Sequence, residues 1–172
     1  MSLDQIDAVG FGRGLRGLGL NLLVADVSRS LRFHQTVFDW QVFQPTTDFA
    51  ILRRPDGSAI LQLHADHTYH ANPLAGLLPT AAPRGAGAEL RLFDTDPDSA
   101  TAKAASMARG EPESGGVVLQ PPTNKPHGLR EAYILDPDGY CWVPSRPLSD
   151  TEVASLEALA GGPTPQKQEH DQ

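Results

Sequence analysis

The period of the hydrophobic positions changes along the chain, and these changes mark out strands and helices. A mostly apolar run at residues 18–24 predicts a strand. Asp26 suits a helix N-cap, and Val27 and Leu31 then recur at helical spacing. Three more strands are predicted, at residues 41–44, 49–53 and 59–64. The first half of the chain therefore has the order β-α-β-β-β.

The same order of elements repeats in the second half. A strand candidate at 89–93 precedes Asp96 and Pro97, and proline suits the first position of a helix, here predicted to end near Gly110. Further strands are predicted at 116–120, 130–135 and 140–143. Each half closes with a hairpin around a Pro-Asp-Gly turn, which begins at Pro55 or Pro137. A repeat of this kind constrains the fold more than any single strand does.

The repeat also divides the chain into segments. We predict a flexible N-terminal arm, a single domain made of two units and a linker, a short C-terminal helix and a disordered tail. The arm is 1–17, the domain 18–147, its units 18–70 and 88–147, the linker 71–87, the helix 148–160 and the tail 161–172. The arm contains G-x-G-x-x-G at 12–17, but a dinucleotide site needs a helix after this motif. Because a strand is predicted there, we interpret the match as chance.

Composition and charge exclude several classes of protein. The chain has 172 residues, of which 40% are apolar and 20% charged, so wholesale disorder is not expected. The single cysteine, Cys141, excludes an internal disulfide and a thiolate-rich zinc site. No apolar run could span a bilayer and no apolar signal segment follows Met1, so we expect a cytoplasmic protein without a membrane partner. The net charge is −7, and the sequence shows no cluster of basic residues of the kind that nucleic-acid-binding proteins carry on one face, so we expect no nucleic-acid partner.

Two segments carry a resemblance to a known superfamily. They are VADVSRSLRFH at 24–34 and YILDPDGYCW at 133–142. With the doubled β-α-β-β-β order, they make residues 18–147 resemble the vicinal oxygen chelate superfamily, which includes glyoxalase I, extradiol dioxygenases and fosfomycin- and bleomycin-resistance proteins. The resemblance implies an α+β fold whose two units curl into an open, cup-like barrel around one concave site. It also implies a small-molecule ligand and a homodimer.

The resemblance further implies four positions for metal ligands. They fall on Gly19, Gln62, Glu89 and Val143. Glutamate is a strong ligand for a hard cation and glutamine a weak one, whereas glycine and valine side chains offer no donor. A shift of two residues would bring in Asn21 but still no imidazole. Zinc, nickel and iron sites need three or four committed donors, so we expect no standard metal site and no cofactor.

Residues two apart on a strand share a face, so the resemblance also implies which residues line the cup. Several of these are polar, as a site for a polar ligand requires. The predicted ligand-binding residues are Asn21, Gln62, His64, Glu89, Arg91, Glu131 and Tyr133, with Cys141 and Val143 on the same face. The alternative is that Glu89 and Arg91 simply neutralise each other on a wet sheet face.

Other candidate residues have two interpretations each. His64, His67 and His70 form an H-x-x-H-x-x-H run that could bind a metal, but this spacing sends side chains to alternating sides of an extended chain. We therefore expect solvated histidines, with His64 alone on the cup face as a metal ligand or proton-transfer group. Cys141 is expected to be an inert thiol because no base is placed beside it. Arg130 is an anchor for an anion or a surface charge.

These observations predict a small-molecule-binding protein that lacks the standard metal site. The alternative is an enzyme, a lyase, isomerase or dioxygenase. Its irregular site would hold a divalent metal ion with Gln62, His64 and Glu89. Trp40 and Trp142 are assigned to the core, because buried aromatic side chains dominate packing.

Overall fold

The computed structural model describes residues 7–68, 77 and 83–160. In the first unit, β1 lies parallel to β4, and β2, β3 and β4 follow each other as antiparallel neighbours in the sheet order β1-β4-β3-β2. The elements of this unit are β1 (Leu20–Val24), α2 (Val27–Phe38), β2 (Gln41–Phe43), β3 (Phe49–Arg53) and β4 (Ile60–Ala65).

The second unit repeats this topology with the order β5-β8-β7-β6. Its elements are β5 (Glu89–Leu92), α3 (Pro97–Gly110), β6 (Val117–Asn124), β7 (Leu129–Leu135) and β8 (Cys141–Pro147). The predicted α+β architecture of two βαβββ units is therefore confirmed. The described strands form two separate sheets and do not close into a barrel.

The two aspartates predicted to start helices do so. Asp26 Oδ1 accepts a hydrogen bond from the backbone N–H of Arg29 at 2.9 Å, and Asp96 accepts from the N–H groups of Asp98 and Ser99. These carboxylates satisfy donors that have no partner within the helix. The repeated aspartates, Asp26 and Asp96, therefore mark the starts of α2 and α3.

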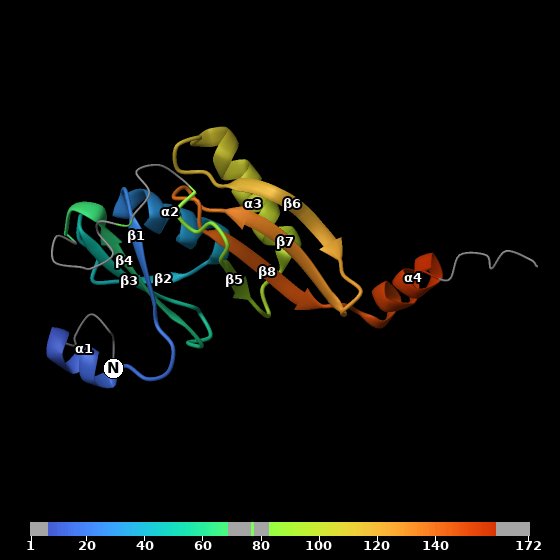
Figure 1. The fold of residues 1–172 in the computed structure, drawn as a ribbon, viewed down its shortest axis with the longest axis horizontal. Helices are drawn as coiled ribbons and strands as arrows, with labels where there is room; N and C mark the ends of the chain where they lie inside the picture. Colours follow the sequence, from blue (N-terminus) through green and yellow to red (C-terminus); the bar gives the residue numbers. More distant parts are fainter. Residues whose placement is uncertain (1–6, 69–76, 78–82, 161–172) are drawn as a thin grey trace, which may run out of the picture.

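One hydrophobic core serves both units. Apolar side chains from one face of each sheet join those of α2 and α3, which pack against each other (Figure 1). The ring of Trp142 on β8 lies 4.9 Å from that of His34 on α2, and both side chains are fully buried. Trp40 is also buried, so both tryptophans lie in the core as predicted. The opposite face of each sheet points away from this core.

The second Pro-Asp-Gly turn joins the units. Asp138 is 2% exposed and accepts hydrogen bonds from Ala25 N at 2.8 Å and Ser30 Oγ at 3.0 Å, both in the first unit. Arg84 lies 3.6 Å from Asp138 and also bonds Asp66, so it bridges the two units. The start of α2 is thus held by a carboxylate from the last hairpin.

A close backbone approach accompanies this contact. Gly139 has a φ of 85°, and a side chain there would overlap the backbone of Pro83. The Tyr140 hydroxyl donates to the carbonyl of Leu23 at 3.0 Å. Glycine is therefore required at this turn both for its dihedral angle and for space.

The N-terminal arm contains structure that the sequence analysis missed. α1 (Ala8–Gly14) is a helix, because Asp7 accepts a hydrogen bond from Gly10 N at its start. The glycine motif at 12–17 begins inside α1 and is followed by strand β1. A dinucleotide site has the opposite order, with a strand before the motif and a helix after it. Residues 1–6, most of the linker and the tail at 161–172 lie outside the described residues.

The second terminal helix, α4 (Asp150–Ala160), lies within residues 148–160, where a short C-terminal helix is predicted. It projects beyond the end of the second sheet, at the opposite end of the molecule from α1 (Figure 1). Within residues 7–68, 77 and 83–160, no helix has the length and hydropathy needed to cross a membrane.

Candidate ligand-binding site

The predicted site residues of the first unit lie together on the sheet face that points away from the core. Asn21 on β1 is the register partner of Gln62 on β4, and His64 follows two residues later on the same face. The ring centroid of His64 lies 4.7 Å from that of Phe49 on β3. Partial burial lowers the pKa of His64, which favours its neutral form. This group therefore offers an amide pair and a neutral imidazole.

The predicted residues of the second unit form a charged cluster on the corresponding face of the other sheet. Arg91 on β5 bonds Glu89 at 3.2 Å and makes a very short contact with Glu131 on β7. Glu131 is only 1% exposed. The ammonium nitrogen of Lys125 lies over the ring of Tyr133, 5.4 Å from the ring centroid. Arg91 thus pairs with Glu89, as the alternative interpretation of these two residues holds, and has Glu131 as a second partner.

His127 belongs to this cluster, and the sequence analysis did not single it out. Its Nε2 lies 3.0 Å from Glu131 Oε1. His127 is in the turn between β6 and β7, where Gly128 has a φ of 85°. This turn folds the imidazole back over the strand that follows. A histidine beside a turn glycine, four residues before an acidic strand residue, was the available signal.

A cavity lies at the equivalent place in each unit. The larger, of about 660 Å³, lies between the segment before β1 and the hairpin turn that leads into β4; its lining residues are Gly14, Leu15, Arg16, Gly17, Leu18, Gly19, Gly57, Ser58, Ala59, Ile60 and Gln62. The smaller, of about 370 Å³, lies between the segment before β5 and the turn that leads into β8; its lining residues are Pro83, Gly85, Ala86, Gly87, Ala88, Glu89, Leu119, Leu135, Gly139 and Cys141. Each cavity is therefore lined by residues of one half of the chain.

The two cavities differ in chemistry. The larger is lined by glycines, other small residues and a few aliphatic side chains, and its polar side chains are those of Arg16, Ser58 and Gln62. The smaller has apolar walls at Leu119 and Leu135 and one carboxylate, Glu89. The Cys141 thiol also lines it, and burial, together with the charges of Glu89 and Asp136, raises the pKa of this thiol. A protonated thiol is a poor nucleophile, which agrees with an inert Cys141.

The residues at the four implied metal positions do not fit a metal ion. Gly19 and Gln62 line the larger cavity, Glu89 lines the smaller, and Val143 is fully buried. Two of these four side chains have no donor atom, and Glu89 is already paired with Arg91. In the part of the chain that the structure describes, no three His, Cys, Asp or Glu side chains are grouped as metal ligands.

The histidine run does not act as one unit where the structure describes it. His64 lies on β4, whereas His67 is in the short 3-10 helix η2 (Asp66–Thr68) and is bonded to Asp48 on the surface. His70 lies outside the described residues. His67 is therefore a solvated histidine, as expected, and His64 alone faces the candidate site.

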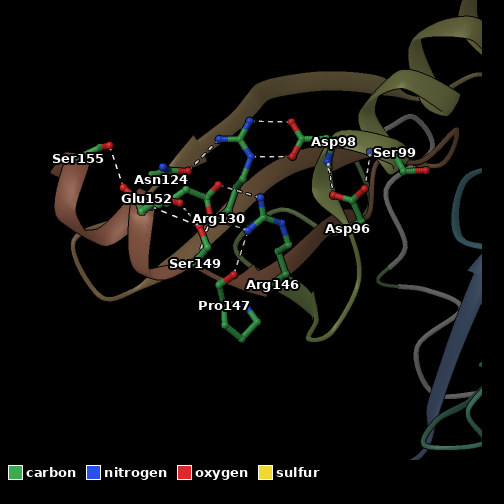
Figure 2. Close-up of polar contacts among 11 residues, drawn as sticks. Asp96, Asp98, Ser99, Asn124, Arg130, Arg146, Pro147, Ser149, Glu152 and Ser155 are labelled. Atoms are coloured by element: carbon green, nitrogen blue, oxygen red, sulfur yellow. Dashed lines mark hydrogen bonds and ion pairs between the residues drawn. The ribbon is translucent and has the colours of Figure 1, made fainter.

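Arg130 has a structural partner instead of an open position at a rim. Figure 2 shows its guanidinium facing Asp98 at the start of α3, with two hydrogen bonds of 2.6 Å. Asn124 accepts a third hydrogen bond. Nearby, Arg146 bonds Glu152 and so ties α4 to β8 (Figure 2). Of the two interpretations of Arg130, the surface charge on the outer face agrees with the structure.

Comparisons with known proteins identify the fold. Similar solved structures include a glyoxalase/bleomycin resistance protein/dioxygenase family enzyme from Burkholderia phytofirmans PsJN, with a TM-score of 0.57 and 18% identity over 75% of this chain and 96% of that one. A glyoxalase/bleomycin resistance protein/dioxygenase from Nocardioides has a TM-score of 0.56 and 19% identity over 79% and 87%. A glyoxalase-related enzyme from Fulvimarina pelagi has a TM-score of 0.58 and 18% identity over 79% and 94%. Neither a protein-family model nor a curated protein matches the sequence. The chain therefore has the fold of the glyoxalase/bleomycin resistance protein/dioxygenase structures, the fold that its resemblance to the vicinal oxygen chelate superfamily implies.

Proposed function

We propose that the protein binds a small polar molecule in the larger cavity, without a metal ion. The observation that carries this proposal is the position of Gly19 and Gln62, since both of the metal positions implied for the first unit line that cavity. A volume of about 660 Å³ also lies within the usual range for ligand pockets, roughly 300–1,000 Å³. Asn21 and His64 lie beside Gln62 on the same sheet face and extend its polar surface.

The side chains at these positions favour binding over metal-dependent chemistry. Gly19 supplies space and no ligand atom, and an amide such as Gln62 is a weak metal donor that hydrogen-bonds neutral polar groups well. The competing lyase, isomerase or dioxygenase with Gln62, His64 and Glu89 would depend on a weak amide donor and on a carboxylate that is already paired with Arg91. We therefore rank it second.

The proposal keeps a cytoplasmic homodimer, as the sequence analysis expects. Val117 and Leu119 on edge strand β6 are 57% and 56% exposed and offer apolar contact area for a second copy. Light scattering on the purified protein tests this part of the proposal, and a monomer at micromolar concentration would contradict it.

The binding proposal is tested by blocking the cavity. A side chain at Gly19 would meet no atom within 4 Å of its Cβ, so Gly19→Trp should fold normally and fill the cavity. Gly12 in α1 is equally open and lies outside the cavity, which makes Gly12→Trp the matched control. A panel of neutral and charged metabolite-sized compounds is screened by thermal unfolding, and hits are retested on both variants and on Gln62→Ala.

A ligand at a hundred times its Kd adds about 2.7 kcal/mol of stability, which raises Tm by several degrees. The proposal expects this rise in wild type and Gly12→Trp, its loss in Gly19→Trp and a smaller rise in Gln62→Ala. Hits that bind Gly19→Trp normally would place the ligand elsewhere. The same screen includes zinc, nickel and manganese ions. A metal-induced rise that Gln62→Ala and Glu89→Ala abolish would favour the enzyme instead.

A further inference from the structure

The charged cluster on the second sheet contains a histidine held by a buried carboxylate. The side chain of Glu131 is 1% exposed, and that of His127 is 55% exposed. His127 Nε2 lies 3.0 Å from Glu131 Oε1, and Arg91 bonds the same oxygen. A carboxylate acts most strongly on a partner when it is buried, because water does not screen the interaction. The inner end of the imidazole is thus fixed by the protein, and the outer end faces solvent.

This contact determines which ring nitrogen carries the proton. Glu131 as a carboxylate can only accept, so a neutral His127 donates its Nε2–H to it. The lone pair of the neutral ring then lies on Nδ1, on the side away from Glu131. A neutral imidazole oriented by a carboxylate in this way is arranged to accept a proton at the free nitrogen.

The charges of the cluster determine which ligand charge is compatible with this face. Arg91 pairs with both Glu89 and Glu131, and these three side chains together carry one excess negative charge. Lys125, the other cation of this face, lies over the ring of Tyr133. This excess negative charge repels an anion and favours a neutral or cationic ligand.

We propose that His127 is the proton acceptor of a second site, with Glu131 as its positioning residue and a neutral or cationic weak acid as its ligand. In the step, the bond between the ligand's acidic atom and its proton breaks, and the proton bonds to Nδ1 of His127. The electron pair stays on the ligand, and the imidazolium remains paired with Glu131. A protonated amine would leave as the neutral amine, so the step needs no further reactant.

The chain contains a matched control for this arrangement. His67 Nε2 lies 3.0 Å from Asp48 Oδ1, the same kind of contact at the same distance. The difference is burial, because the side chain of Asp48 is 49% exposed and that of His67 is 68% exposed. An exposed carboxylate is screened by water and holds its partner weakly. The proposal therefore predicts that the two imidazoles react differently although both are accessible.

The experiment measures the free nitrogen directly with diethyl pyrocarbonate. The imidazole lone pair attacks the reagent's carbonyl carbon, an N–C bond forms and ethyl carbonate leaves. Near pH 8.5, where free imidazoles are neutral, peptide mass spectrometry gives a rate for each histidine. We expect His127 to react at least roughly threefold faster than His67, and Glu131→Gln to remove this advantage while His67 is unchanged. Asp48→Asn should leave both rates near those of wild type.

A purely structural ion-pair cluster gives other results. If His127 reacts no faster than His67, or keeps its wild-type rate in folded Glu131→Gln, the proposal is wrong. If Glu131→Gln does not fold, long-range proton–nitrogen NMR of the wild type decides the question. His127 as the Nε2–H form with a bare Nδ1 supports the proposal, and a mixture of tautomers overturns it. Gly19→Trp should not affect these measurements, so this proposal and the binding proposal fail independently.

Discussion

The two Pro-Asp-Gly turns share their sequence and differ in what surrounds them. Asp56 in the first turn has an exposed side chain and bonds its own neighbour Ser58. Asp138 in the second turn is buried and bonds the start of α2 in the other unit. The local sequence therefore determines that a turn forms, and the tertiary contact determines how much the turn contributes to stability.

The residue before each proline explains the difference. In the first turn it is Arg54, whose guanidinium reaches the carbonyl of Phe93 at 2.9 Å, close to the start of α3. In the second turn it is Asp136, which accepts hydrogen bonds from the N–H groups of Asp138 and Tyr140 and from Trp142 Nε1. Both turns thus touch the helix start of the other unit, the first through Arg54, whose side chain is 15% exposed, and the second through the buried carboxylate of Asp138.

The largest expected effect comes from removing the buried carboxylate. Asp138→Ala leaves Ser30 Oγ and the Ala25 N–H without their acceptor and Arg84 without one of its ion pairs. Breaking such a buried pair lowers the free energy of unfolding by about 3–5 kcal/mol. Urea denaturation measures this loss. The matched control, Asp56→Ala, should change stability little, and equal losses in the two variants would show that the turns are equivalent.

The stability of the core near the second turn is expected to depend on pH, because it contains the buried His34. Burial lowers the pKa of His34 from 6.5 to about 4. Between these values the unfolded chain binds a proton that the folded chain does not, so this group's contribution to stability falls as the pH falls from about 6.5 to about 4. His34→Phe should therefore gain up to about 3 kcal/mol relative to wild type across this window and nothing above it.

Burial has the opposite sign at Asp136. Its pKa is raised to about 6, so the folded chain holds a proton that the unfolded chain has released, and stability falls as the pH rises from about 3.8 to about 6. In wild type the two effects oppose each other. Denaturation curves of His34→Phe at several pH values should reveal the Asp136 slope. If the difference in the free energy of unfolding between His34→Phe and wild type stays constant from pH 6.5 to about pH 4, the assignment to His34 is wrong.

The smallest of the three expected effects is the difference in stability between alanine substitutions at the two turn glycines. Both have positive φ, 75° at Gly57 and 85° at Gly139, so alanine is strained at either position. Only at Gly139 would the new methyl group also overlap Pro83. Gly57→Ala should lower stability by about 1 kcal/mol, and Gly139→Ala by about 1–3 kcal/mol more. Thermal unfolding of the two variants measures the difference, and equal Tm values would show that the segment at Pro83 moves freely.

The sequence predicts the fold well because its signals are local. The caps Asp26 and Asp96 and the two Pro-Asp-Gly turns act within a few residues of their own position, so the pattern locates each element to within a few residues. α1 was missed because two internal glycines hide its periodicity and only the Asp7 cap signals it.

The site is less predictable because its contacts are distant in sequence. The pairs Arg91–Glu131 and Arg130–Asp98 depend on how strands and a helix are placed in space, and alternation gives only the face of each residue. His127 enters the cluster through the turn at Gly128, which no periodicity describes. The two cavities also depend on how the segments before β1 and β5 lie against the hairpin turns, which a pattern within each unit does not contain.

The shared core has a consequence for cutting the chain. Neither repeat can bury its helix alone, since α2 and α3 cover each other and Trp142 packs against α2. A protein cleaved between residues 68 and 83 would thus consist of two fragments that each expose an apolar surface. Expressed together, the fragments should recombine through the Asp138 and Arg84 contacts, as a heterodimer that carries one cavity on each member.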